Sequence, residues 1–277
     1  MKNILIIGSA GNIGKNLKIA LSKKYNLISP KKSKEFNISN LKSLEKYFNE
    51  KLDIVINLSG QRESKFKMLN TIVKGNKNII RLLSKIKKKI LVIYISSNLI
   101  YGFSEKLLNE KSKTYPLSDY AKFKLRAEKL YKKTDLNYLI LRLGNIYGDI
   151  QNETNIISNI YRAVKANKKL KIANKDVYRN FISISDLISI LTKLISSKLK
   201  HKIYNVGYEN LKIDHILAYF KKIYKKDIKF VEQKIRKQTL SSQKINCSKL
   251  LKELNIRPRN KMYKYLLKYS RNEIKLS

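Results

Sequence analysis

The chain of 277 residues, 43% of them hydrophobic, is long enough for one large domain or two smaller ones with an apolar core. No apolar run reaches the roughly 18 residues of a membrane span, and strand-like residues begin at Ile4, which leaves no room for a signal peptide. The single Cys247 excludes an intramolecular disulfide framework, and two isolated histidines, His201 and His215, make a zinc-type metal site unexpected. We therefore expect a cytoplasmic protein without a membrane span and without a metal.

The net charge of +41 arises from 61 lysines and arginines against 20 acidic residues. Such an excess is typical of nucleic-acid-binding proteins. However, only ten of the basic residues are arginines, which are preferred for gripping phosphate and reading bases, and the lysines are spread over the whole chain. Lys, Asn, Ile and Tyr are abundant together, as expected for an AT-rich genome. We therefore favour codon bias and expect no nucleic-acid partner, with nucleic-acid binding kept as the weaker alternative.

The first motif is an apolar strand, Ile4 to Ile7, that runs into Gly8, Gly11 and Gly14. After Gly14 the apolar residues have helical spacing, so the sequence predicts a strand, a glycine-rich turn and a helix. This arrangement aims backbone N–H groups and the positive end of a helix dipole at one point, which suits the pyrophosphate of a dinucleotide. Glycines after a strand can also serve only to form a turn, so this motif alone leaves both interpretations open.

A second strand is predicted over residues 26–29 and ends at Pro30. In dinucleotide folds the end of this strand faces the adenosine ribose, where an acidic residue selects NAD. Lys31 and Lys32 follow Pro30 instead, and a basic pair would attract the 2′-phosphate of NADP. The sequence therefore favours NADP over NAD, unless these lysines belong only to the general lysine background.

Strands and helices alternate along the first half of the chain. Apolar runs predict strands at 53–58, 90–95 and 139–143, and helical spacing predicts helices at 41–48, 66–85 and 120–131. This alternation is typical of a Rossmann-type α/β fold, a doubly wound parallel sheet with helices on both faces. Right-handed crossovers then bring the carboxyl ends of the strands, and the ligand, to one edge of the sheet.

The second half of the chain has shorter elements and no flexible linker. Strands are predicted at 181–184 and 203–206 and helices at 186–197, 213–225 and 246–254, whereas 150–175 looks helical without a sheet element and the end of the chain is a basic tail. We interpret residues 1–149 and 176–207 as a dinucleotide-binding domain. Residues 150–175 and 208–277 then form a smaller substrate-binding domain that is interleaved with it.

Three polar residues are candidates for catalysis at the strand edge: Ser97, Tyr120 and Lys124. Oxidation of an alcohol by a nicotinamide needs a base for the hydroxyl proton, and a tyrosine with a pKa near ~10 is protonated at neutral pH. Tyr120 and Lys124 lie four residues apart on one helix face, so the ammonium group can lower the pKa of the phenol. Ser97 follows a predicted strand, and its hydroxyl can hold the substrate oxygen.

Further motifs follow in a fixed order along the chain. The series consists of Gly8–Gly14, Asp53–Leu58, Ser96–Gly102, Glu110, Pro116–Lys124, Leu141–Gly148, Arg179–Asp186, Ile203–Gly207 and Cys247–Pro258. In order and spacing this series resembles the extended short-chain dehydrogenase/reductases, the nucleotide-sugar epimerase/dehydratase/reductase family. The resemblance covers almost the whole chain.

The resemblance implies roles for individual residues. Tyr120 would be the general acid or base, Lys124 would tune it and bind the nicotinamide ribose, and Ser97 would be its hydroxyl partner. The implied cofactor-binding residues are Gly8, Gly11, Asn12, Ile13, Gly14, Asn37, Ile38, Leu58 and Ser59, besides Lys31. Asn145, Arg179 and Arg236 fall where the family contacts the sugar nucleotide, with Arg179 on its diphosphate; a turn cap and a surface salt bridge are the alternatives for the first two.

Some positions depart from the family pattern. Asn37 replaces the usual acidic residue and Asn180 replaces the Asp that usually follows the arginine, and both departures bear on the strength and selectivity of ligand binding. Asn98 and Leu99 follow Ser97, where the 4,6-dehydratases of the family carry Asp and Glu. This difference disfavours a dehydratase.

The sequence thus predicts an NAD(P)-dependent epimerase or reductase of nucleotide-activated sugars. Hydride would pass between the nicotinamide and a sugar carbon, C4 in our interpretation, while Tyr120 moves the hydroxyl proton. A non-catalytic NADP-binding regulatory protein on the same fold is the main alternative, and the intact Ser97, Tyr120 and Lys124 argue against it. The resemblance also implies a homodimer, formed through the helices at 66–85 and 120–131.

Overall fold

The computed structural model describes residues 1–30, 36–148, 155–232 and 242–274. The chain groups into two compact units. The first comprises Met1–Gly102, Lys113–Leu143 and Ile190–Asn205, and the second comprises Phe103–Ser112, Gly144–Ser189 and Val206–Ser277. Residues 103–112, 144–148, 176–189 and 206–207 therefore group with the second unit, whereas the sequence interpretation assigned them to the dinucleotide-binding domain.

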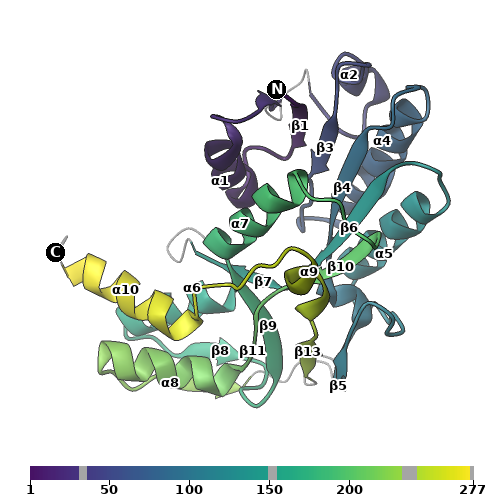
Figure 1. Ribbon diagram of the computed structural model, residues 1–277. Coiled ribbons are helices and arrows are strands. Elements are labelled where there is room, and N and C mark those ends of the chain that lie inside the picture. The colour runs from purple at the N-terminus through teal and green to yellow at the C-terminus, as the bar shows by residue number, and fades with distance from the viewer. Residues whose placement is uncertain (31–35, 149–154, 233–241, 275–277) are drawn as a thin grey trace. The chain divides into compact units, whose positions relative to one another are not determined.

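The first unit is built on a six-stranded sheet with the strand order β10-β6-β4-β3-β1-β2 (Figure 1). Its strands are β1 (Asn3–Ile7), β2 (Asn26–Ile28), β3 (Ile54–Asn57), β4 (Leu91–Ser97), β6 (Tyr138–Leu143) and β10 (Ile203–Val206). The pairs β1/β2, β1/β3, β3/β4 and β4/β6 are parallel. Because β2 and β3 lie on opposite sides of β1, the winding reverses at β1, and ligands bind at the carboxyl ends beside such a reversal. The predicted doubly wound α/β fold is confirmed.

Helices cover both faces of this sheet, with α1 on one face and α4 and α5 on the other (Figure 1). The helices are α1 (Asn12–Leu21), α2 (Leu41–Glu45), α3 (Lys65–Met68), the π-helix η1 (Leu69–Lys74), α4 (Gly75–Leu83), the 3₁₀-helix η2 (Asn98–Tyr101), α5 (Asp119–Lys132) and α7 (Ile184–Ile195), which begins in the second unit. The predicted helix at 66–85 is thus a continuous run of α3, η1 and α4. A π-helical turn of this kind is rare and frequently occurs at functional sites.

One apolar core of the first unit lies between the sheet and the helices α4 and α5. Leu5 and Val92 from the sheet, Ile79 from α4, and Ala127 and Tyr131 from α5 belong to one cluster of buried side chains. All four residues of β3 are buried, as expected for a strand covered on both faces, and this explains its continuous apolar run.

A buried polar network ties α5 to the sheet. The Glu128 carboxylate accepts hydrogen bonds from Arg142 Nη2 at 2.7 Å, from Arg142 Nε at 3.1 Å and from the Ser96 hydroxyl at 2.6 Å. Arg142 Nη1 also donates to the Tyr101 hydroxyl, which in turn donates to Asn205 Oδ1, both at 2.7 Å. Because the charges of Glu128 and Arg142 are paired and further hydrogen-bonded, they can remain buried.

The described residues of the second unit form three small sheets. Its strands are β5 (Ser104–Leu108), β7 (Asn145–Tyr147), β8 (Leu170–Ile172), β9 (Tyr178–Ser183), β11 (Glu209–Lys212), β12 (Phe230–Glu232) and β13 (Gln243–Ile245), and its helices are α6 (Ile156–Lys165), α8 (Ile213–Tyr224), α9 (Ser248–Glu253) and α10 (Met262–Ile274). The sheets are β11-β9-β7, β12-β8 and β13-β5. Apolar side chains of α6, α8 and α10, such as Ile160, Phe220 and Leu266, share one core.

The structure corrects the sequence interpretation of this half of the chain. Residues 150–175 include the strand β8, which pairs with the distant β12, and the expected basic tail contains the helix α10. β9 pairs with β7 and β11 and is not a strand of the six-stranded sheet. None of the described helices is both long and apolar enough to cross a membrane.

Arg142→Leu should lower the free energy of unfolding by about 3 kcal/mol or more, because the substitution leaves the Glu128 carboxylate buried without its cation. The matched control is Lys67→Ala, which breaks the exposed ion pair with Glu63 and should cost much less. Urea unfolding followed by circular dichroism measures both losses. Similar losses in the two variants would contradict the stabilising role of the buried network.

Candidate functional site

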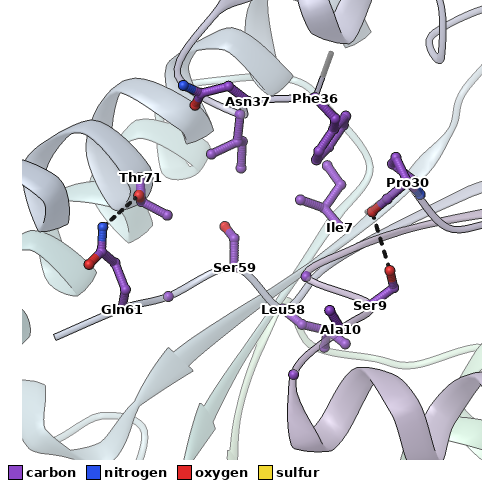
Figure 2. A pocket seen from close by; sticks show the side chains of 14 residues that line it. Ile7, Ser9, Ala10, Pro30, Phe36, Asn37, Leu58, Ser59, Gln61 and Thr71 are labelled. Atoms are coloured by element: carbon purple, nitrogen blue, oxygen red, sulfur yellow. Dashed lines mark hydrogen bonds between the residues drawn. The ribbon is translucent and has the colours of Figure 1, made fainter. Parts of the chain in front are cut away.

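A cavity of about 300 Å³ opens at the carboxyl ends of β1 and β3 (Figure 2). The glycine turn after β1 forms one wall with residues 7–11, and the segment after β3 forms another with residues 58–61. Pro30, Thr71 and residues 36–38 complete the lining. The cavity therefore lies where the reversal of winding at β1 places a ligand site.

The turn after β1 is held in a conformation that requires glycine at two positions. Gly8 has a φ of +85°, and a Cβ there would lie 3.0 Å from the backbone carbon of Leu58. A Cβ on Gly14 would lie 2.5 Å from the Gly8 carbonyl oxygen, so α1 packs directly against the turn. Gly11 precedes the first residue of α1, which makes the turn and the helix N-terminus continuous. Asn12 and Ile13 lie in the first turn of α1 and do not line the cavity.

Hydrogen bonds between buried side chains fix the segment after β3. Asn57 Oδ1 accepts hydrogen bonds from the Ser59 backbone N–H at 3.0 Å and from the Ser59 hydroxyl at 2.6 Å. Asn57 Nδ2 donates to Asn76 Oδ1 at 2.9 Å, and this oxygen also accepts from the Tyr131 hydroxyl at 2.7 Å. The Leu58 backbone N–H donates to the Ile7 carbonyl at 2.9 Å. The cavity wall at Leu58 and Ser59 is therefore tied to β1, α4 and α5.

The cavity wall at residues 36–38 combines buried apolar side chains with an exposed polar one. Phe36 and Ile38 are buried, whereas Asn37 is exposed. The Asn37 side-chain oxygen accepts hydrogen bonds from the Ser39 backbone N–H at 3.0 Å and from the Ser39 hydroxyl at 2.9 Å. Asn37 thus stabilises the turn with its oxygen and carries no charge, in contrast to the acidic residue that the family pattern has at this position. Lys31, which we expected near this wall, lies outside the described residues.

Lys124 and Tyr120 lie next to the cavity wall. The Ser118 hydroxyl caps α5 by accepting a hydrogen bond from the Ala121 backbone N–H at 3.2 Å, so that Tyr120 falls in the first turn of the helix. A Cβ placed on Gly60, which lines the cavity, would lie 3.3 Å from Lys124 Nζ and 4.0 Å from the Tyr120 hydroxyl. The structure therefore brings these two predicted residues together with the glycine turn on one edge of the sheet.

The Lys124 ammonium group is buried, with 2% of the residue exposed. Its Nζ donates to the Ile95 carbonyl at 2.7 Å and to the Ser59 carbonyl at 3.4 Å. Burial lowers the pKa of Lys124 below its ordinary value, while the neighbouring Tyr120 opposes this effect. These contacts hold a cation between β3, β4 and α5.

Tyr120 has a lowered pKa because of two neighbouring cations. Burial alone raises the pKa of its phenol, but the charges of Lys124 and Arg62 and a hydrogen bond with Arg62 together outweigh burial, and the net pKa lies below the ordinary value. The guanidinium carbon of Arg62 lies 4.4 Å from the centroid of the Tyr120 ring. Sequence reasoning missed Arg62, although its position shortly after the end of β3 places it on the edge where ligands bind.

Ser97 ends β4, and its hydroxyl accepts a hydrogen bond from the Leu99 backbone N–H at 3.2 Å. This contact uses a lone pair of the oxygen, so the O–H proton remains able to donate. Gln61 and Thr71 were not predicted either, yet they line the cavity and are joined by a hydrogen bond of 3.4 Å (Figure 2). Within the described part of the chain, no three His, Cys, Asp or Glu side chains are grouped as metal ligands.

Asn145 and Arg179 belong to the second unit. Asn145 begins β7, and its Nδ2 donates to the Asn180 carbonyl at 3.0 Å. The Arg179 guanidinium carbon lies 4.7 Å from the centroid of the Phe103 ring, and Nη1 donates to the Tyr178 carbonyl at 2.7 Å. Burial lowers the pKa of Arg179 to about 10, against the opposing charge of Glu105. Arg236, the third expected substrate contact, lies outside the described residues.

Comparisons with known proteins identify a family and a shared fold. The profile of the NAD dependent epimerase/dehydratase family matches residues 4–207. GDP-6-deoxy-D-talose 4-dehydrogenase from Aggregatibacter actinomycetemcomitans is 28% identical over 233 residues, which cover 78% of this chain and 79% of that protein.

Two solved structures share the fold over nearly the full length of both chains. UDP-glucuronic acid 4-epimerase from Bacillus cereus, in complex with UDP-glucuronic acid and NAD, has a TM-score of 0.83 at 21% identity and covers 99% of this chain and 100% of that chain. RMD from Pseudomonas aeruginosa, complexed with NADPH, has a TM-score of 0.83 at 22% identity with the same coverage. Both similarities concern the fold.

Gly14→Ala should lower the free energy of unfolding by about 2 kcal/mol, because the added methyl group collides with the backbone of the glycine turn. Gly11→Ala is the matched control, since a Cβ there meets its nearest atom at 3.5 Å, an ordinary contact. Thermal unfolding of both variants checks the difference. Equal melting temperatures would show that close packing of α1 on the turn does not stabilise the protein.

Proposed function

Because the chain belongs to the NAD dependent epimerase/dehydratase family, we propose that it is an NAD(P)-dependent epimerase or reductase that acts on a nucleotide-activated sugar. The observation that carries this proposal is the position of Tyr120 and Lys124 beside Gly60, a residue of the cavity wall. The names of the relatives support the substrate class, since they refer to a GDP-linked and a UDP-linked sugar.

The cavity has the features of a dinucleotide site. The turn from Gly8 to Gly11 and the N-terminus of α1 would hold the pyrophosphate through backbone N–H groups. Phe36 and Ile38 offer apolar side chains for the adenine, and Ser59 and Leu58 line the opposite wall. When bound, the nicotinamide would supply hydride acceptance or donation at a sugar carbon, for which we propose C4.

Tyr120 would move the hydroxyl proton. In oxidation the sugar O–H and C–H bonds break and a C=O bond forms, with the proton passing to the Tyr120 phenolate as the hydride leaves. In reduction the neutral phenol returns this proton. Lys124 and Arg62 favour the phenolate because their positive charges face the ring. The Ser97 hydroxyl can donate a hydrogen bond to the substrate oxygen in both oxidation and reduction.

The second unit would contribute substrate contacts. We propose that Arg179 binds the diphosphate of the sugar nucleotide and that Asn145 and Arg236 contact the substrate as well. Support for Arg179 comes from its partly buried guanidinium, whose pKa is lowered to about 10 by burial, so an incoming anion would stabilise its charge. Formation of a homodimer stays a proposal that rests on the resemblance alone.

A panel of UDP-, GDP-, CDP- and dTDP-sugars, incubated with the oxidised or the reduced form of NAD or NADP and followed at the nicotinamide absorbance, tests the activity. Steady loss of the reduced cofactor identifies a reductase, and product formation without net cofactor change identifies an epimerase.

Tyr120→Phe should lower turnover at least about 100-fold, because the proton acceptor is lost, and leave dinucleotide affinity within a few-fold. Normal turnover by this variant would refute the assigned role of Tyr120. Dinucleotide binding without turnover of any sugar would favour a regulatory protein.

Replacing the basic pair after Pro30 tests cofactor choice. We expect the double variant Lys31→Asp and Lys32→Ala to weaken NADP binding relative to NAD, because it removes positive charge and adds an acid where the ribose is expected. Fluorescence titration with each dinucleotide measures the ratio of the two affinities. An unchanged ratio of the two affinities would show that these lysines do not influence the choice of cofactor.

A further inference from the structure

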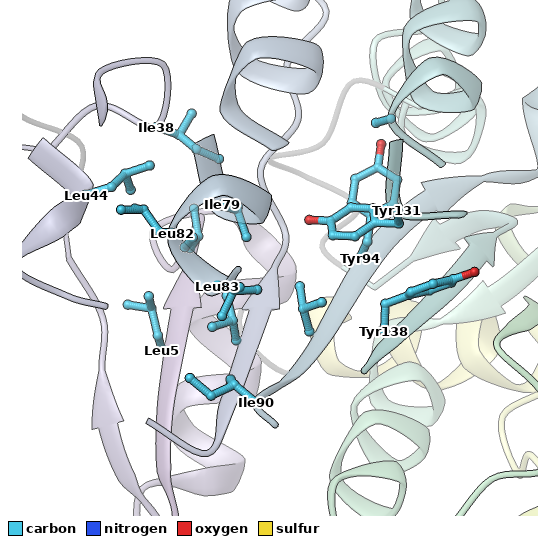
Figure 3. Packing of buried hydrophobic residues seen from close by; sticks show 14 of the residues in the cluster. Leu5, Ile38, Leu44, Ile79, Leu82, Leu83, Ile90, Tyr94, Tyr131 and Tyr138 are labelled. Atoms are coloured by element: carbon cyan, nitrogen blue, oxygen red, sulfur yellow. The ribbon is translucent and has the colours of Figure 1, made fainter. Parts of the chain in front are cut away.

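Tyr94 packs beneath α5, the helix that carries Tyr120 and Lys124, and it has no role in the reaction described above. It belongs to β4, is fully buried, and packs against Tyr131 of α5 with the ring centroids 5.4 Å apart (Figure 3). Lys124 Nζ lies 5.0 Å from the centroid of the Tyr94 ring, within the range of a cation–π contact. The ring of Tyr94 thus faces the ammonium group from the sheet side.

The hydroxyl group of Tyr94 does not explain why a tyrosine occupies this position. Among the described residues, no hydrogen-bond partner lies within reach of this buried oxygen. A buried hydroxyl without a partner is unfavourable, whereas the aromatic ring has a specific neighbour in Lys124. What Tyr94 contributes to the surroundings of Lys124 must therefore come from its aromatic ring.

The surroundings of Lys124 show what the ring adds. On the side of the sheet, the ammonium group contacts the carbonyl of Ser59, just after β3, and the Ile95 carbonyl and the Tyr94 ring of β4. On α5 its charged or titratable neighbours are Tyr120 and Glu128, and Arg62 faces it from the loop after β3. The carboxylate of Glu128 is engaged by Arg142, and Arg62 opposes the charge of Lys124. Tyr94 therefore supplies one of the few favourable contacts that a buried cation receives here.

We propose that Tyr94 is a positioning residue, whose ring holds the Lys124 ammonium group charged and fixed next to Tyr120 through a cation–π contact. The consequence for turnover rests on the proposed function, whereas the contact itself does not. If Lys124 lost this contact, it would release its proton at a lower pH. The phenol of Tyr120 would then keep its proton to a higher pH, because a neutral amine does not stabilise the phenolate.

Tyr94→Phe and Tyr94→Met separate the ring from the hydroxyl. The ionisation of Tyr120 is measured in the ligand-free protein by ultraviolet absorbance of tyrosinate, as the difference between each variant and its Tyr120→Phe counterpart. We expect Tyr94→Phe to keep the midpoint of the parent and to melt at the same or a higher temperature. Tyr94→Met should raise the midpoint by about half a pH unit, since it retains bulk but removes the ring. If Tyr94→Met does not fold, Tyr94→Leu serves as the ringless variant.

Repeating the measurement with Lys124→Met separates an effect through Lys124 from a packing effect. In that background Tyr94→Met should leave the Tyr120 midpoint unchanged. An equal shift with and without Lys124, the same shift in Tyr94→Phe, or no shift in Tyr94→Met would each overturn the proposal. If the parent turns over no nucleotide sugar, the proposed function fails while the absorbance result still decides the role of Tyr94. With an active parent, Tyr94→Met should lower kcat and leave KM close to the parental value.

Discussion

The burial of the Lys124 ammonium group is the constraint on which the candidate site depends. A buried cation costs several kcal/mol unless the protein replaces its hydration, so its partners must stay in place. Here the replacement comes from the carbonyl of Ile95, within β4, and the carbonyl of Ser59, just after the neighbouring parallel strand β3. One turn further along α5, Glu128 is paired with Arg142 of β6. The two contacts together fix both the rotation of α5 and its distance from the sheet.

Ser59 connects this constraint to the cavity. Its carbonyl accepts from Lys124, its hydroxyl and N–H donate to Asn57, and the residue itself lines the cavity. Asn57 is linked through Asn76 to Tyr131 of α5. The wall that would hold a dinucleotide and the helix that carries Tyr120 are therefore parts of one hydrogen-bonded network. Such a network suits hydride transfer, which requires the donor, the acceptor and the proton carrier to be aligned together.

The sequence predicted the features that leave a local signal. Continuous apolar runs marked β1, β3, β4 and β6, and the four-residue spacing of Tyr120 and Lys124 placed both side chains on one helix face. Three-residue strands such as β8 and β12 carry no period, and their pairing joins distant segments, so they could not be seen. Arg62 is hidden by the abundance of basic residues, and Tyr94 resembles any other apolar residue of a buried strand. The contacts of both with the site arise only from tertiary packing.

The central claim is that this site transfers hydride between a sugar carbon and a nicotinamide, with Tyr120 carrying the proton. The most direct measurement uses a nucleotide sugar deuterated at the carbon that is oxidised, mixed with enzyme and NAD(P) and quenched within one turnover. We predict deuterium on the nicotinamide, detected by mass spectrometry, with the parent protein and very little with Tyr120→Phe. No deuterium on the nicotinamide of the parent during sugar turnover, or equal labelling with both proteins, would contradict the account.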